Sequence, residues 1–268
     1  MSQNKEILIK FDSIHKEYGD FTAVKEINLE IAKGELFGFL GPNGAGKTTM
    51  IRMLTGIIRP TSGTITIGGY NLYQEPIKAK SLIGYVPDRP YLYEKLSPVE
   101  YFDFMGGLYN VPKERIKEIS EKMLKLFDLW DKKDELIESF SHGMKQKTAM
   151  IAAILHDPEI LVVDEPTVGL DPRSIKLVKE YFKHLTDEGK TLFLTTHTLS
   201  VAEDLCQRIA IIRHGEIVAL GSLSDLQKQA KMPGNDLESV FLKLTEEEEE
   251  EEQGREPAAK AESVSSAP

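Results

Sequence analysis

The segment Gly41-Pro42-Asn43-Gly44-Ala45-Gly46-Lys47-Thr48 decides how the rest of the chain is interpreted. It matches the pattern G-x-x-x-x-G-K-[ST] of a phosphate-binding loop, in which backbone N–H groups surround phosphate oxygens. A predicted strand, Glu35–Leu40, precedes it, and a predicted helix, Thr48–Thr55, follows it. Lys47 can reach the β- and γ-phosphates of a nucleotide, and Thr48 can bind Mg²⁺. An ordinary glycine-rich turn is the alternative, but it does not explain the Lys-Thr pair in this context.

Two acidic residues, Asp164 and Glu165, end the apolar run that begins at Ile160. The run lacks polar alternation, as expected for a strand buried on both faces of a parallel sheet. Ligands of open α/β sheets bind at the carboxyl ends of such strands. We therefore expect Asp164 to contact Mg²⁺, directly or through water, and Glu165 to orient or deprotonate an attacking water. The alternative is a solvated pair of acids that caps the next turn.

Strands alternate with helices over most of the chain, which predicts an α/β fold. Beyond the phosphate loop, helical periodicity dominates from about Pro98 to Leu155, and this predicts a helical subdomain at about 89–156 inserted between strands. The predicted strands are Ile7–Phe11, Thr22–Ile31, Thr64–Ile67, Ile83–Val86, Ile160–Asp164, Thr191–Thr195, Ile209–Ile212 and Ile217–Leu220. The predicted helices are Glu100–Tyr109, Lys113–Leu129, Gly143–Leu155, Arg173–Leu185, Ser200–Cys206, Leu223–Lys231 and Asp236–Leu244.

Charge and composition divide the chain into residues 1–244, predicted as one domain, and residues 245–268, predicted as a disordered acidic tail. The tail holds nine glutamates against two basic residues, and it cannot bury enough apolar surface to order itself. The remainder is nearly balanced in charge, unlike a nucleic-acid-binding surface, so we expect no nucleic-acid partner. The single cysteine, Cys206, and the lack of a long apolar run or signal peptide predict a cytoplasmic chain without a membrane span.

A third motif, Phe140-Ser141-His142-Gly143-Met144-Lys145-Gln146, stands between the phosphate loop and the Asp164–Glu165 pair. The three motifs in this order resemble those of ABC transporter ATPases, and the resemblance extends from about Ile7 to Leu220. It implies a P-loop NTPase core with a mainly parallel sheet, an antiparallel β subdomain and an inserted helical subdomain. It also implies ATP and Mg²⁺ as ligands, and a head-to-tail dimer that encloses two ATP molecules.

The resemblance gives roles to further residues. Ser141 and Gly143 would contact ATP held by the other subunit, where a helix N-terminus attracts the γ-phosphate. The segment Gly169-Leu-Asp-Pro, which contains Asp171, resembles the family's loop that connects the two ATP sites. His197 resembles the family's histidine that contacts the γ-phosphate. Tyr18 matches the aromatic residue that stacks on adenine, and the alternative is a tyrosine of the core or the surface. For Ser141 the alternative is a plain helix cap. The implied catalytic residues are Lys47, Glu165 and His197. The implied magnesium site comprises Thr48, Asp88 and Asp164. The implied nucleotide contacts are Tyr18, Gly41, Pro42, Asn43, Gly44, Ala45, Gly46, Lys47, Thr48, Thr49, Asp88, Ser141, Gly143, Asp164 and Asp171.

Two positions depart from the family pattern. Asp88 stands where the family usually has glutamine, and His142 replaces the usual first glycine of the signature. Asp88 can still accept a hydrogen bond from Mg²⁺-bound water, whereas His142 places a bulky side chain near the partner's ATP. We therefore expect that the site hydrolyses ATP, with the rate or the coupling to the permease altered by these two residues.

The implied function is ATP hydrolysis that drives a membrane permease on a separate chain, with the ATPase subunits forming a homodimer or heterodimer at the inner face of the membrane. The stretch from Tyr85 to Ser97 resembles bacterial multidrug-type exporters more than importers. One alternative is a soluble switch of the same superfamily in translation or DNA repair, but this chain has neither two cassettes nor a long insertion. Another is a P-loop kinase, which would not need Ser141 or His197 and for which no acceptor site is evident.

Overall fold

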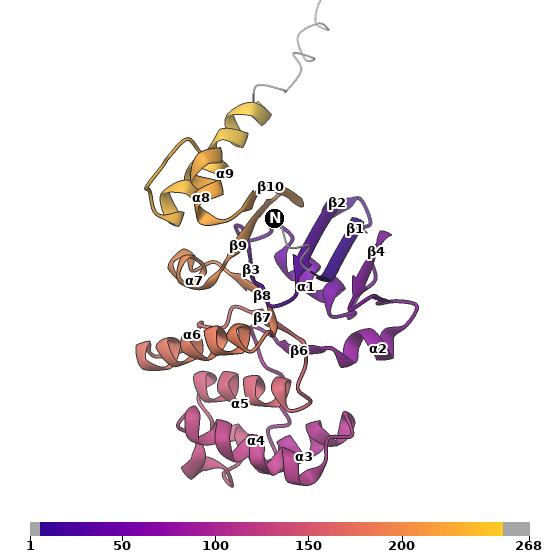
Figure 1. Cartoon of the computed structure of the whole chain (residues 1–268), viewed down its shortest axis with the longest axis vertical. Helices are drawn as coiled ribbons and strands as arrows, with labels where there is room; N and C mark the ends of the chain where they lie inside the picture. Colours follow the sequence, from indigo (N-terminus) through magenta and orange to yellow (C-terminus); the bar gives the residue numbers. More distant parts are fainter. Residues whose placement is uncertain (1–5, 254–268) are drawn as a thin grey trace, which may run out of the picture.

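The computed structural model describes residues 6–253, and side chains as far as Thr245. Figure 1 shows an antiparallel sheet on one side, a second sheet through the centre, and a group of helices at one end. The second sheet has the order β10-β9-β3-β8-β7-β6. Its strands are β3 (Leu36–Leu40), β6 (Ile83–Val86), β7 (Ile160–Asp164), β8 (Thr191–Thr196), β9 (Arg208–Arg213) and β10 (Glu216–Gly221). All neighbours in it are parallel except β9 and β10, so the predicted mainly parallel sheet is confirmed.

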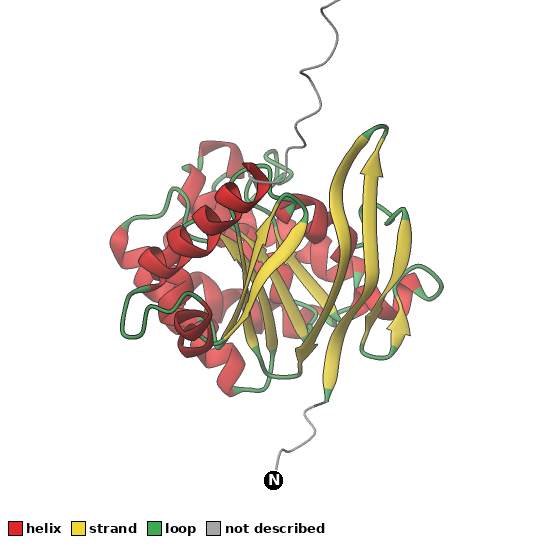
Figure 2. Cartoon of the chain, turned by 90° about the horizontal axis from the view of Figure 1, so that it is seen from above, coloured by secondary structure: helices red, strands yellow, loops and turns green. Residues whose placement is uncertain are grey.

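The antiparallel sheet has the order β2-β1-β4-β5. Its strands are β1 (Ile7–Tyr18), β2 (Phe21–Ala32), β4 (Ser62–Ile67) and β5 (Tyr70–Asn71). Figure 2 shows its two long strands side by side. The prediction that β1 ends at Phe11 was wrong, because a register shift between Phe11 and Ile14 interrupts the apolar alternation without ending the strand. Ser13, inside this shift, has a positive φ of 47°, as some β-bulges require.

Helices cover both faces of the central sheet and form a separate layer below it (Figures 1 and 2). The helices near the sheet are α1 (Lys47–Leu54), α2 (Pro76–Ser81), α6 (Pro172–Asp187), α7 (Leu199–Leu205), α8 (Leu223–Gln229) and α9 (Leu237–Gln253). The separate layer contains α3 (Pro98–Leu108), α4 (Lys113–Leu126), η1 (Trp130–Lys132), η2 (Ile137–Ser139) and α5 (His142–Ile154), all between β6 and β7 in the chain. Ser97 caps α3 in a capping box with Glu100, as its sequence suggests.

Helix α9 continues through Thr245 to Gln253, where the sequence analysis expected a disordered tail. Its beginning is anchored by the buried side chains of Leu237 and Val240. Adding residues to an existing helix is easier than starting one, and glutamate is a good helix former, which accounts for the extension. Residues 254–268 of the predicted tail lie outside the described residues.

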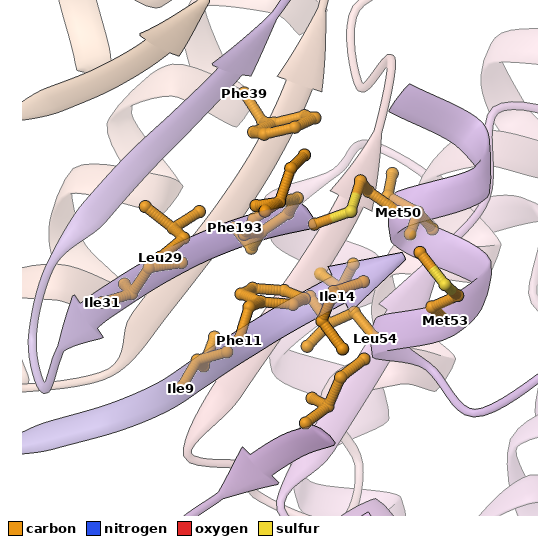
Figure 3. Packing of buried hydrophobic residues seen from close by; sticks show 14 of the residues in the cluster. Ile9, Phe11, Ile14, Leu29, Ile31, Phe39, Met50, Met53, Leu54 and Phe193 are labelled. Atoms are coloured by element: carbon orange, nitrogen blue, oxygen red, sulfur yellow. The ribbon is translucent and has the colours of Figure 1, made fainter. Parts of the chain in front are cut away.

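The core between the two sheets surrounds Phe193 on β8 (Figure 3). The ring centroid of Phe193 lies 5.6 Å from that of Phe39, 5.9 Å from that of Phe37 and 6.4 Å from that of Phe11. Met50 and other apolar residues of α1 pack against this cluster. The helix that follows the phosphate loop is therefore fixed to both sheets, and this packing sets the position of the loop.

Candidate functional site

The phosphate loop connects the end of β3 to the start of α1, as the sequence predicts. Gly41 lies against β9 so closely that an added Cβ atom would be 2.2 Å from the carbonyl oxygen of Ile212. Gly46 precedes the first helical residue with a φ of 111°, a conformation that side-chain-bearing residues rarely adopt. These two glycines let the backbone turn tightly, so that the N-terminal N–H groups of α1 face the space above the loop.

Lys47 is held inside this loop. Its Nζ donates hydrogen bonds to the carbonyl oxygens of Gly41, at 2.6 Å, and Pro42, at 2.9 Å. Burial lowers the pKa of Lys47, while the nearby carboxylates of Glu165 and Asp164 act in the opposite direction. The buried amine is thus a donor that an anionic phosphate oxygen would stabilise.

Asp164 is the last residue of β7 and Glu165 follows it, and both line the same cavity as the phosphate loop. The Asp164 carboxylate accepts a 2.5 Å hydrogen bond from Thr195 Oγ1 on the neighbouring strand β8. Burial raises the pKa of Asp164, and the carboxylates of Glu165 and Asp88 add to the effect against that hydrogen bond and the Lys47 charge. A cation beside Asp164 would relieve this cost of burying its charge.

Glu165 is paired with His197. Its Oε1 lies 2.9 Å from His197 Nδ1, and its Oε2 accepts a 3.3 Å hydrogen bond from the backbone N–H of His197. Glu165 also has a positive φ of 50°, which is uncommon for a residue other than glycine. The two contacts and this backbone conformation fix the carboxylate beside the phosphate loop.

A cavity of about 500 Å³ brings most of the predicted site together. Its walls include these residues that the sequence analysis identified: Asn43, Gly44, Gly46, Lys47, Thr48, Thr49, Asp88, Asp164, Glu165 and His197. They also include Phe21, Ala23 and Val168, which it missed. The sequence signal for Phe21 is an aromatic residue directly after the Gly19-Asp20 turn, at the first position of β2.

Some predicted residues lie outside this wall. Gly41, Pro42 and Ala45 belong to the loop but do not line the cavity, and the first two act as acceptors for Lys47. Tyr18 is not among the described residues that line the cavity. Its ring instead lies beside Lys16, whose Nζ is 5.0 Å from the ring centroid. The adenine-stacking role of Tyr18 stays a prediction.

The signature segment lies away from this cavity and contacts the Gly169–Asp171 loop. Ser141 caps α5 by accepting a 3.3 Å hydrogen bond from the Met144 N–H, and Asp171 caps α6. An added Cβ atom on Gly143 would be 3.0 Å from the Gly169 carbonyl oxygen. The His142 ring occupies the space beside Gly169, where an added Cβ would meet it at 2.5 Å. Ser141, Gly143 and Asp171 therefore form a second surface of the chain.

The magnesium prediction depends on only a few protein ligands. Across residues 6–253, no group of three or more histidine, cysteine, aspartate or glutamate side chains is arranged to hold a metal ion. Mg²⁺ at nucleotide sites usually takes one or two protein oxygens together with phosphates and water. Thr48, Asp88 and Asp164 line the same cavity and fit that mode of binding.

A phosphate loop at the end of a parallel strand, next to two acids at the end of another, defines a P-loop nucleoside triphosphatase. The chain belongs to the ABC transporter family, whose model, described as "ABC transporter", matches residues 24–168. Within that family it is an ATP-binding subunit that hydrolyses ATP. The kinase and soluble-switch alternatives find no support in the family match.

Relatives of known name agree with this assignment. The linearmycin resistance ATP-binding protein LnrL of Bacillus subtilis is 42% identical over 219 residues, covering 82% of this chain and 70% of the relative. The Nod factor export ATP-binding protein I of Cupriavidus metallidurans is 36% identical, covering 82% and 72%.

Solved structures agree as well. An ATP-binding subunit of an ABC transporter superposes with a TM-score of 0.85 at 30% identity, covering 89% of this chain and 99% of that one. The cassette MJ0796, solved as a dimer in a post-hydrolysis state with ADP and Pi, gives a TM-score of 0.72 at 26% identity, covering 81% and 99%.

Proposed function

We propose that this subunit powers an exporter, as a Mg²⁺-dependent, head-to-tail dimer bound to a membrane permease on a separate chain. The export assignment is supported by the similarity to proteins named for linearmycin resistance and for Nod factor export. The dimer is supported by the dimeric structures of MJ0796.

Hydrolysis is proposed to follow from the positions of the cavity residues. Lys47 and the N–H groups of the loop would hold the β- and γ-phosphates, which positions the terminal phosphorus for in-line attack. Thr48, Asp88 and Asp164 would hold Mg²⁺, directly or through water, and the ion would supply positive charge beside the phosphate oxygens. Glu165 would accept a hydrogen bond from the attacking water, and His197 would orient that carboxylate and donate to the γ-phosphate.

The second surface supports the proposed dimer. Ser141 and Gly143 are not among the residues that line the cavity of their own chain, and Gly143 lies next to the Gly169–Asp171 loop. The start of α5 carries the positive end of a helix dipole and a polar cap, both of which favour a phosphate. Placed against the phosphate loop of another subunit, this surface would close the site from above.

An apolar groove of about 280 Å³ supports the proposed permease contact. It lies between the core and the helical layer and is lined by the loop after β6, by α3 and by α5. On its rim, Tyr91 is 90% exposed and Tyr109 is 42% exposed. No helix in residues 6–253 is both long enough and apolar enough to cross a membrane. We propose that an intracellular helix of the permease inserts here.

The trans assignment is tested by the solution mass of a Glu165→Gln variant, measured by light scattering with ATP–Mg²⁺ and with ADP. Slowing hydrolysis should leave the chain as a dimer with ATP and a monomer with ADP. Adding Ser141→Arg should abolish the dimer, because it places a bulky cation on the proposed contact. Ser139→Arg, at an exposed position two residues earlier, is the matched control and should dimerise normally. A dimer that survives Ser141→Arg would contradict the head-to-tail arrangement.

A further inference from the structure

Gln146 is a completely buried polar side chain that the ATP site described above does not use. It lies on the second turn of α5, after the signature residues. Its Nε2 donates a 3.3 Å hydrogen bond to the carbonyl oxygen of Pro87, in the loop that follows β6. Its Oε1 is buried and has no hydrogen-bond partner within the described chain.

Gln146 contacts the Pro87–Asp88 segment, which lies between the apolar groove and the phosphate cavity. Pro87 lines the apolar groove, whereas Asp88, the next residue, lines the phosphate cavity. The groove is also lined by Ala149, Ala152 and Ala153, which follow Gln146 along α5. Any shift of the Pro87–Asp88 peptide would therefore change both cavities, and Gln146 connects that peptide to the signature helix.

The side-chain oxygen of Gln146 is buried and has no hydrogen-bond partner within the described chain. A buried amide oxygen without a donor costs free energy, so natural proteins seldom keep one without a reason. In this conformation the side chain uses one amide N–H, which donates to Pro87, and its oxygen has no partner within the described chain. The hydrogen-bonding capacity of Gln146 is therefore half satisfied, and its bond to the loop that carries Asp88 is the part that is made.

We propose that Gln146 is a positioning residue, which holds the Pro87–Asp88 peptide through its hydrogen bond to Pro87 and thereby sets the place of Asp88 in the ATP site. This inference rests on the proposed role of Asp88 in the ATP site. Gln146 itself touches neither cavity.

The test compares Mg²⁺-ATP hydrolysis by the full chain and by Gln146→Met, a change of similar shape without hydrogen-bonding groups. We expect kcat to fall about tenfold, since a displaced catalytic group slows the reaction strongly, while KM for ATP stays within about twofold because the phosphate loop is intact. The melting temperature should change little, because the loss of the hydrogen bond to Pro87 is offset by the removal of a buried oxygen that has no partner. A purely structural glutamine predicts the reverse, with a lower melting temperature and an unchanged kcat.

Thr148→Val is the matched control, since Thr148 is buried on the same helix but its Oγ1 donates only to the Met144 carbonyl of that helix. It should leave kcat unchanged. If Gln146→Met does not fold, Gln146→Leu is used in its place. An unchanged kcat in the folded variant would overturn the proposal.

A double-mutant cycle with Asp88→Asn separates this inference from the proposed function. If Gln146 acts through Asp88, the double variant should be about as slow as the slower single variant, whereas independent effects would multiply. Multiplying effects would overturn the inference while leaving Asp88 in the ATP site. An unchanged kcat for Asp88→Asn alone would instead remove the role of Asp88, and the inference with it.

Discussion

Replacing Arg208 with alanine is expected to destabilise the fold by about 3 kcal/mol, because it leaves the buried Glu35 carboxylate without its cation. Glu35 lies between β2 and β3, where the two sheets meet, and is only 3% exposed. Arg208 Nη1 lies 3.0 Å from Glu35 Oε1 and 3.2 Å from Oε2. The carboxylate also accepts a 2.9 Å hydrogen bond from the Ala32 N–H, which cannot replace the lost charge.

The magnitude follows from this geometry. Breaking a buried pair typically costs about 3–5 kcal/mol, and we take the lower end because the Arg208 side chain is 35% exposed and water can reach the vacated space. For a chain of this size the melting temperature should fall by roughly 6–12 °C. The assay is urea and thermal unfolding followed by circular dichroism, with the ATPase rate as a check that the folded fraction is native.

Two further variants make the prediction specific. Adding Glu35→Gln to Arg208→Ala should restore more than half of the lost stability, because the neutral amide no longer buries a charge. Lys10→Ala is the control: its pair with Glu30, at 3.3 Å, is half exposed and should contribute less than about 1 kcal/mol. Equal losses for Arg208→Ala and Lys10→Ala, or a double variant no more stable than the single one, would refute the reasoning.

Three other perturbations have defined outcomes. Asp164→Asn should abolish hydrolysis yet raise the melting temperature of the nucleotide-free protein, because burial raises the pKa of Asp164 and its charge opposes folding. The folded state then binds the proton more tightly than the unfolded state, so this gain should be largest at neutral pH and disappear as pH falls through the raised pKa toward the unfolded value of about 3.9. Lys47→Ala should weaken ATP binding by at least about tenfold in a fluorescent-nucleotide titration, since it removes the charged donor to the phosphates. Ser97→Ala should lower the stability of the fold by about 1 kcal/mol in urea unfolding, because it removes the N-cap of α3; an unchanged midpoint would contradict this role.

The parts of the fold that were predicted from sequence are those that local chemistry determines. The run Ile160–Asp164 has no polar side chain before its last residue, and its length and β-branched residues favour a strand buried on both faces. The phosphate-loop motif also predicts the secondary structure on either side of it, because phosphate binding requires a strand before the loop and a helix after it. Both were found within a residue or two of the positions in the structure.

The parts that were missed depend on contacts between distant segments. The continuation of β1 past Phe11 is determined by its pairing with β2 and β4 across a bulge, which the alternation of its own residues does not show. The bond from Gln146 to Pro87 joins positions 59 residues apart, and nothing in the sequence indicates that these two residues are in contact. The wall position of Phe21 likewise depends on how the antiparallel sheet lies against the phosphate loop.

Several locally unfavourable features converge on the nucleotide cavity. Burial lowers the pKa of Lys47 and raises that of Asp164, so each charge is held where its ionised form is disfavoured. Glu165 adds a backbone conformation that non-glycine residues avoid. An anion beside Lys47 and a cation beside Asp164 would remove both electrostatic costs at once. The nucleotide-free site is therefore poised for a ligand that carries both charges, which is the character of a nucleoside triphosphate with Mg²⁺.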